Sequence, residues 1–194
     1  MKINEQLATP DNYRVTVATE EQIINFLQGI FDKVNDVAEI IDSFRSNGWA
    51  MQTWLRACRD GIVPFQQSTY HNLIPSVLRN SLATLISGTT VTPTFKAQYF
   101  ALGTSSTAPA NTDTQLGAES VRLALTNRSS YTNIAYLDVF FPSTSVGGNT
   151  YLEAGIFVDG SGSANSGYLL SHVAINQTLG SSQTLTVNSS ITIS

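Results

Sequence analysis

The spacing of apolar residues along the chain changes at about residue 89. Before this point apolar side chains recur every three to four residues, which is the period of an amphipathic helix. After it they alternate with polar ones, as in a half-buried strand. The chain has 194 residues, enough for one medium-sized domain with an appendage. We therefore expect an α+β fold, with an N-terminal helical (coiled-coil) region followed by an antiparallel β-sandwich.

The most regular pattern lies in residues 19–48, which we expect to form one long helix. It opens with a capping box, in which Thr19 and Gln22 exchange hydrogen bonds. It ends at Ser-Asn-Gly, where Asn47 or Gly48 can adopt the left-handed conformation that terminates helices. Between these signals the apolar residues are alternately four and three positions apart, which is a heptad repeat. The heptad positions are Ile23, Leu27, Ile30, Val34, Val37, Ile41 and Phe44.

This heptad repeat has two interpretations. It is the seam of a coiled coil, in which β-branched residues at the d positions favour three or more strands over a parallel pair. Alternatively, it is the apolar face of a helix that packs on its own domain, and the apolar neighbours Ile24, Phe31 and Ala38 widen the stripe as such a helix requires. We favour the first interpretation, a homotrimer in which the seven heptad residues make the contacts between copies.

The segments on either side of the heptad region are less regular. Residues 1–18 are mostly polar and contain Pro10, so we expect an extended arm. Residues 49–88 contain two shorter amphipathic runs, at 49–61 and 74–88, each of which ends at a glycine. We expect two short helices here.

Residues 89–194 have the alternation of an antiparallel sandwich. Turns rich in glycine, proline and asparagine separate the strand-like runs, and a weaker strand is expected at 120–126. The five clearer runs are 94–102, 133–141, 150–158, 167–175 and 183–193.

Composition narrows the classes of function. Charged residues make up 12% of the chain, about half of the usual ~25%, and a surface of neutral hydroxyls and amides suits a protein that is part of an assembly. The net charge is −4 and the Lys and Arg residues form no run, so we expect no nucleic-acid partner.

No apolar run approaches the ~20 residues that span a bilayer, so we expect no membrane insertion. The N-terminus has no apolar core of a secretion signal, which indicates synthesis in a cytoplasm.

Groups that could perform catalysis are scarce. Cys58 is the single cysteine, and we expect it to be a small buried residue. The two histidines, His71 and His172, are far apart, and we expect each to be structural. The turn that begins at Asp159 resembles a calcium loop but has Leu170 where a bidentate Glu is required. We therefore predict no catalytic residue, no metal site and no cofactor.

Glu119 and Arg122 follow a long Thr- and Ala-rich loop, 103–118, in a region with few other charges. If they are buried beneath this loop, a charge-assisted pair would fix it to the sandwich. A catalytic use of Glu119 is the alternative and would need a second carboxylate, for which Asp113 is the nearest in sequence. We favour the structural clamp.

Several short motifs occur in a fixed order between residues 70 and 194. A helix precedes a strand that ends in A-L-G-T, and D-T-x-L and Glu-x-x-Arg follow; E-A-G-I-F and L-L-S-H come later. In this order they resemble a domain of structural proteins from tailed bacteriophages. The matching positions are Ala101 to Thr104, Asp113, Thr114, Leu116, Glu119, Arg122, Glu153 to Phe157 and Ser171 to His172.

This resemblance implies a β-sandwich module of a tail fibre, a baseplate appendage or another virion attachment, with no catalytic residue at the matching positions. We therefore expect a non-enzymatic virion protein that is made in the host cytoplasm and docks on other virion proteins through its N-terminal part. A trimeric short tail fibre or baseplate-associated protein is our first choice, and a capsid decoration (cement) or neck protein is the alternative. A carbohydrate-active enzyme on the same scaffold is the alternative from another class, and it would require two carboxylates in one groove.

Tyr131 is the candidate ligand contact. It lies in a polar turn, N-R-S-S-Y-T-N, where an exposed ring could stack on a host surface glycan. The alternative is that the ring packs at a strand edge, because isolated surface aromatic residues are common.

Overall fold

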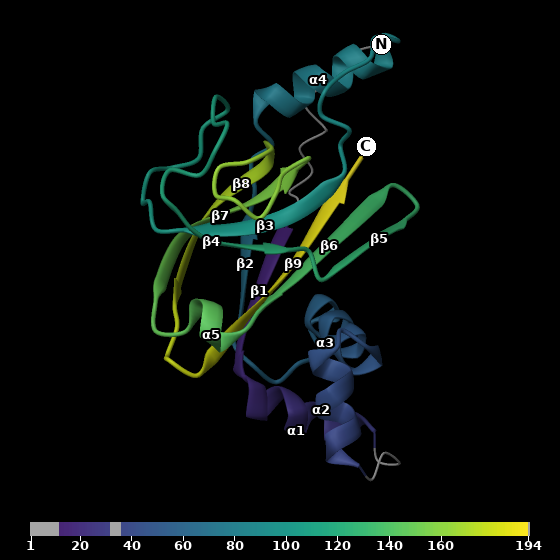
Figure 1. Cartoon of the computed structure of the whole chain (residues 1–194), viewed down its shortest axis with the longest axis vertical. Helices are drawn as coiled ribbons and strands as arrows, with labels where there is room; N and C mark the ends of the chain where they lie inside the picture. The colour runs from purple at the N-terminus through teal and green to yellow at the C-terminus, as the bar shows by residue number, and fades with distance from the viewer. Residues whose placement is uncertain (1–11, 32–35, 194) are drawn as a thin grey trace.

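A computed structural model describes residues 12–31 and 36–193 of the chain. Two antiparallel sheets stack face to face, and helices lie at both ends of the stack (Figure 1). The strand order is β2-β1-β9-β6-β5 in one sheet, called sheet A, and β4-β3-β7-β8 in the other, called sheet B. The strands are β1 (Asn12–Thr19), β2 (Gln67–His71), β3 (Ala97–Gly103), β4 (Glu119–Ala124), β5 (Asn127–Tyr131), β6 (Ile134–Phe141), β7 (Thr150–Val158), β8 (Tyr168–Thr178) and β9 (Gln183–Thr192). The helices are α1 (Glu20–Ile30), α2 (Val37–Arg45), α3 (Trp49–Asp60), α4 (Ser76–Ile86) and α5 (Ser143–Val146).

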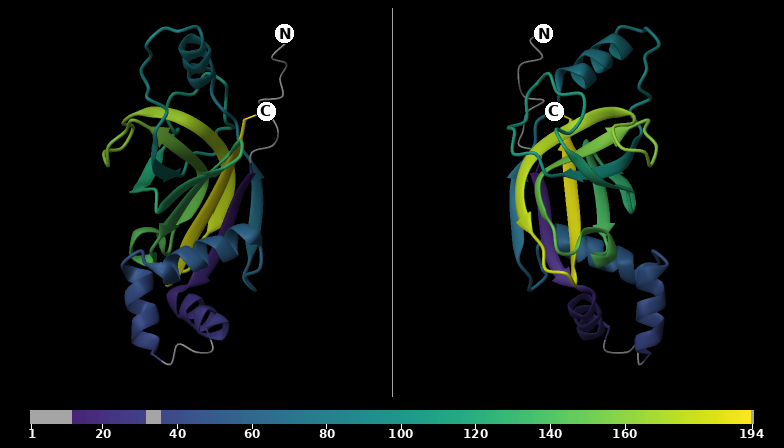
Figure 2. Two further views of the ribbon diagram at one scale, coloured as in Figure 1. Left: turned by 90° about the vertical axis from the view of Figure 1, so that its right-hand side faces the viewer. Right: turned by 60° about the vertical axis from the view of Figure 1, so that its left-hand side comes forward.

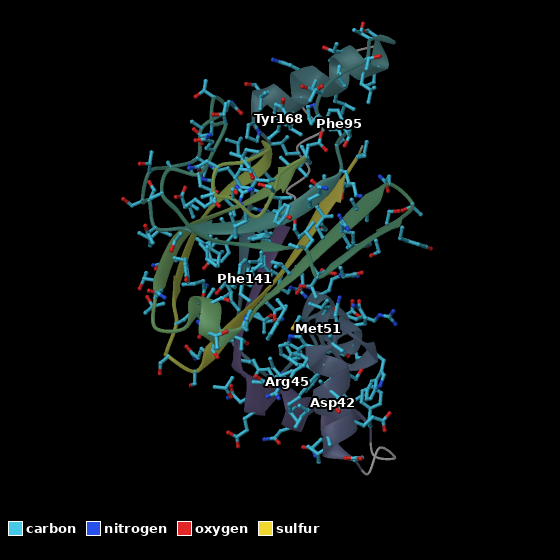
Figure 3. The ribbon with its side chains drawn as sticks, in the orientation of Figure 1. Asp42, Arg45, Met51, Phe95, Phe141 and Tyr168 are labelled. Carbon is cyan, nitrogen blue, oxygen red and sulfur yellow. The ribbon has the colours of Figure 1, made fainter. Side chains whose placement is uncertain are left out.

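The main hydrophobic core lies between the two sheets. Because side chains alternate along a strand, every second residue of a strand points into this core. Val15 of β1 and Val187 of β9 enter it from sheet A, and Phe100 of β3 and Ile156 of β7 enter it from sheet B. Figure 3 shows Phe141 of β6 in this interior. The α+β class expected from the sequence is therefore confirmed, with two antiparallel sheets over one shared core.

Residues 12–19, which the sequence assigned to an extended arm, form an inner strand of sheet A. β1 lies between β2 and β9, with Val15 opposite Ser68 on one side and Val187 on the other. The expected arm is therefore wrong for these residues, and residues 1–11 lie outside the described part of the chain. The alternation of apolar and polar residues within 12–19 is only a few residues long, so this pattern alone could not indicate the two partner strands. With β1 and β2 included, the sheets extend beyond the expected limits of 89–194.

The long helix expected over 19–48 is two helices in the described residues. The capping box is present, since the Gln22 backbone N–H donates to Thr19 Oγ1 (3.2 Å) and the Thr19 N–H donates to Gln22 Oε1 (2.8 Å). α1 ends at Ile30, however, and Asp36 caps a new helix by accepting from the Ala38 N–H at 2.9 Å. A second side-chain cap within a heptad run marks a new helix start.

The heptad positions also divide between the interior and the surface. Ile23, Leu27 and Phe44 are buried within their own subunit, against α3. Ile30 and Val37 are 44% and 41% exposed. Ile41 is half-buried, and Val34 lies outside the described residues. The described residues therefore form no coiled-coil seam, and their pattern is that of helices packed on their own domain.

The helices pack on their own domain because their apolar stripe is broader than a coiled-coil seam. Ile24 and Ile40 are not heptad positions, yet both are buried in the same cluster, because α3 presents a broad apolar face. Trp54 of α3 is fully buried there, and its indole N–H donates to Thr186 Oγ1 of β9 at 2.9 Å. Phe44 packs edge-on against Phe140 of β6, with ring centroids 5.1 Å apart. α1, α2 and α3 thus form a helical subdomain on the outer face of sheet A.

The two short helices expected at 49–61 and 74–88 are confirmed as α3 and α4. Gly61 ends α3 in the left-handed conformation, with φ at 73°, as its position after the last apolar residue predicts. α4 projects from the opposite end of the sheets to α1–α3, and all the views show this separation (Figure 2).

Replacing a buried heptad residue should have a much larger effect than replacing an exposed one. We expect Leu27→Ala to lower the free energy of unfolding by about 2–5 kcal/mol, because it leaves a cavity beside α3. Ile30→Ala should lower it by much less, about 0.5 kcal/mol, because the residue is already 44% exposed. Urea unfolding followed by the fluorescence of the two tryptophans, Trp49 and Trp54, measures both. Equal losses for the two variants would contradict the intramolecular packing.

Candidate functional site

Glu119 and Arg122 form a bidentate ion pair on β4. Arg122 Nε lies 2.7 Å from Glu119 Oε1, and Nη2 lies 2.7 Å from Oε2. Both side chains are 2% exposed, and the guanidinium lies over the ring of Phe157, 3.9 Å from its centroid. Residues three apart face opposite sides of a regular strand. Here β4 has a bulge at Ser120, since Glu119 pairs with Gly103 and Val121 pairs with Leu102, and this places both side chains on one face.

The ion pair holds a different loop from the one expected. Arg122 Nη1 donates to the carbonyl oxygen of Ser166 at 2.8 Å, and the Asn165 N–H donates to Glu119 Oε2 at 3.1 Å. Both partners belong to the turn between β7 and β8. The clamp predicted for residues 103–118 therefore fixes the Gly- and Ser-rich turn at 159–167.

The loop at 104–118 is fixed by Glu153 of β7. Its carboxylate accepts from the backbone N–H groups of Gly117 (2.9 Å), Ala118 (2.7 Å) and Ser105 (3.3 Å). The side chain is 1% exposed, so these charge-assisted bonds replace the water that the carboxylate loses on burial. A Cβ atom at Gly103 would collide with this carboxylate, which explains the glycine that ends the A-L-G motif.

His172 of β8 joins Glu153 to the same loop. Its Nε2 is 3.0 Å from Glu153 Oε2, and its Nδ1 is 2.8 Å from Asp113 Oδ2. The doubly protonated imidazolium can donate to both carboxylates at once, whereas a neutral ring can donate to one only. Asp113 also accepts from the Ala110 N–H at 2.7 Å, which closes the turn at the tip of the loop. The sequence predicted a structural role for His172 but not its two acidic partners.

The motifs of the phage resemblance thus converge on one unit that anchors two loops. Its polar members are Glu119, Arg122, Glu153, Asp113 and His172. Its apolar members form a small cluster beside them, and each is buried or nearly so. The cluster comprises Ala101, Leu116, Phe157 and Leu169, with Tyr99 packed against it. Because the two glutamates are buried and their oxygens accept bonds from the protein itself, the unit fixes loop conformation rather than presenting a reactive carboxylate.

A second buried charge ties the helical subdomain to sheet A. Asp138 of β6 is fully buried and receives the guanidinium of Arg59 from α3. Its carboxylate also accepts from the side-chain amides of Asn127 and Asn188, each at 2.9 Å. Arg59 lies over the ring of Tyr136, with Cζ 4.6 Å from the centroid. The sequence does contain a signal for this buried ion pair: Asp138 is the single acid in the mostly apolar run N-I-A-Y-L-D-V-F-F. The pair was not predicted from it.

In the described part of the chain, the structure shows neither a reactive thiolate at Cys58 nor a cluster of metal-binding side chains. Burial raises the pKa of the Cys58 thiol to about 12, so the reactive thiolate is strongly disfavoured. No group of three or more His, Cys, Asp or Glu side chains is placed to hold a metal ion within residues 12–31 and 36–193. In the Glu153–His172–Asp113 set the two carboxylates lie at opposite nitrogens of the ring, so the three cannot converge on one ion. Among the described helices, none combines the length and the apolar character needed to cross a membrane.

Tyr131 ends β5 and is 72% exposed. It does not pack at a strand edge, so its ring is accessible to a ligand. Contact with a glycan stays a prediction.

An apolar groove of about 480 Å³ lies between α4 and the adjoining ends of the two sheets. One wall consists of Leu78, Leu82 and Leu85 from α4, and Ile191 and Ile193 contribute to the opposite wall. Three cationic side chains also line the groove: Arg79, Lys96 and Arg128. The leucines belong to the amphipathic run at 74–88, but no local pattern in the sequence indicates that part of this stripe stays uncovered.

Comparison with known proteins identifies no relative: no family model, no curated protein and no solved structure matches the chain.

Glu153→Gln should loosen the loop at 104–118. The amide cannot accept the same set of backbone bonds and brings an N–H group toward other donors, so we expect the free energy of unfolding to fall by about 2 kcal/mol or more. Hydrogen exchange at the Gly117 and Ala118 amides should accelerate. Asp113→Asn is the matched control and should cost less, because Asp113 is 26% exposed. Unchanged exchange in Glu153→Gln would show that this carboxylate does not hold the loop.

Removing one member of the Glu119–Arg122 pair should be worse than removing both. Arg122→Met leaves Glu119 buried without its cation, and we expect a loss of about 3–5 kcal/mol in unfolding free energy. In the double variant Glu119→Gln/Arg122→Met, no uncompensated charge is buried, and much of the loss should be recovered. A double-mutant cycle by urea unfolding measures the coupling. Additive losses would show that the two side chains act independently.

Proposed function

We propose that the chain is a non-enzymatic structural component of a tailed-phage virion, with a tail-fibre or baseplate-associated role as the first choice. One observation carries the proposal: five polar residues from the motifs that resemble phage structural proteins, Asp113, Glu119, Arg122, Glu153 and His172, are dispersed in the sequence but together anchor two loops. Such a unit gives a projecting module a rigid, loop-rich end.

The chemistry of the buried groups supports a structural role over an enzymatic one. A catalytic acid or base must reach the proton that it transfers, and a glycosidase places two carboxylates on either side of a sugar. Glu119 and Glu153 are 2% and 1% exposed, and each is bonded to backbone groups and to a cation or His172. Neither is available to a substrate in this arrangement.

The architecture also suggests how such a protein would be used. The helical subdomain and the loop-rich sandwich lie toward different ends of the molecule (Figure 1), so the helices could dock on other virion proteins while the sheets project. The exposed ring of Tyr131 is the proposed contact with a host glycan. A trimer built on the heptad seam receives no support, since Ile23, Leu27 and Phe44 are in the core of their own subunit.

Labelling of intact virions with antibodies raised against the chain tests the proposal. We expect gold particles at the tail tip or the baseplate. Labels over the capsid shell or neck would instead support the cement or neck alternative, and unlabelled virions would contradict the virion assignment. Incubation of the protein with host polysaccharide should leave the length of the polysaccharide unchanged, and shortened chains would contradict the non-enzymatic role.

A further inference from the structure

The two ends of the molecule have opposite charge character. Between residues 20 and 45 the sequence contains six acidic and two basic residues, a net charge of −4 that equals that of the whole chain. Between residues 61 and 112 it contains two basic residues and no acidic one. The first segment includes α1 and α2, and the second includes α4. Figure 3 shows Asp42 and Arg45 at one end, and Phe95 and Tyr168 at the other.

The α4 end presents cations around an apolar groove. Arg79, Lys96 and Arg128 form no ion pair with a carboxylate within the described residues. Arg79 donates to Asn111 Oδ1 at 3.0 Å, and Arg128 donates to the carbonyl oxygen of Ala97 at 2.9 Å. Two acids of this region have other partners: Asp159 accepts from the N–H and the hydroxyl of Thr94, and Asp113 pairs with His172.

The groove continues into exposed apolar surface on α4. Leu85 is 46% exposed and Ile86 is 72% exposed, and Ile193 beside the groove is 62% exposed. Clustered exposed aliphatic side chains next to a groove are typical of a surface that another molecule covers.

The opposite end presents complementary features. Ile30 at the end of α1 and Val37 at the start of α2 are exposed heptad residues. Asp36 and Glu39, which flank Val37 in the first turn of α2, are exposed as well. Apolar side chains flanked by acids match an apolar groove flanked by cations.

From this complementarity we infer that the groove at α4 binds the α1–α2 end of a second copy of the chain. The contact is head-to-tail: each copy uses its α4 groove for one neighbour and its α1–α2 end for the other. Such heterologous contacts generate a ring if the rotation closes and a filament if it does not. The inference deepens the proposed structural role, because it states how copies of such a component would assemble.

Two single-end variants test the contact. Leu85→Asp/Ile86→Asp disables the α4 end, and Ile30→Asp/Val37→Asp disables the α1–α2 end. All four side chains are exposed, so both variants should fold, which near-ultraviolet circular dichroism checks. Ile62→Asp is the control, since Ile62 is 65% exposed and belongs to none of α1, α2 and α4.

Sedimentation velocity over a hundredfold concentration range gives the readout. We expect the wild-type chain and the Ile62→Asp control to associate, and each single-end variant to stay monomeric. An equimolar mixture of the two variants should form a dimer and nothing larger, because only one intact pair of surfaces is then available. Association of the wild-type chain should weaken as salt screens the opposite charges.

Three results would overturn the inference. The first is a wild-type chain that is monomeric at every concentration. The second is association of Ile30→Asp/Val37→Asp with itself, which would mean that α4 pairs with α4. The third is association only after deletion of residues 1–11, which would mean that the chain's own N-terminus fills the groove. Virion labelling reports location whether or not copies associate, so the proposed function and this contact can fail separately.

Discussion

The position of β1 as an inner strand of sheet A, between β2 and β9, determines how the two parts of the molecule meet. Its inner face contributes Tyr13, Val15 and Val17 to the core between the sheets. Its outer face carries Arg14, whose guanidinium donates to the carbonyl oxygens of Cys58 and Arg59 at the C-terminal end of α3, where a cation is favoured by the helix dipole. Because α1 follows β1 with no intervening loop, this one strand places the helical subdomain against the sheet.

Burial of the few charges is the second constraint. A chain with only 12% charged residues nevertheless places Asp138, Glu153, Glu119 and Arg122 in the interior. A buried charge is tolerated only with a partner and enough hydrogen bonds. Each of these groups has both, and each connects segments far apart in the sequence. The charges therefore specify which loop or helix lies against which strand, whereas the apolar core supplies the driving force for packing.

The charges left on the surface are distributed unevenly along the molecule. Acidic residues concentrate on α1 and α2, and unpaired cations concentrate around α4. Exposed apolar side chains accompany both groups: Ile30 and Val37 at one end, Leu85 and Ile86 at the other. A molecule with complementary ends and a rigid, loop-anchored body between them is suited to repeated assembly, in agreement with the structural role proposed for it.

Local patterns in the sequence determined the element types, because helix and strand periods and capping residues act over only a few positions. The capping box at Thr19, the stop at Gly61 and the alternation of β9 were all predictable for this reason. The partners of each element depend on contacts between distant residues, and only the tertiary structure decided them.

The heptad spacing of residues 23–44 is compatible with a seam between copies and with a broad stripe on one domain, and the apolar face of α3 selected the second. In the same way, the pairing of Glu119 with Arg122 was expected because they are close together in a segment with few other charges. The bulge that places them on one face, the loop that they hold and the network of Glu153, His172 and Asp113 were not predictable. Those contacts arise where strands β4, β7 and β8 bring residues 19 to 59 positions apart within hydrogen-bonding distance, which no local pattern encodes.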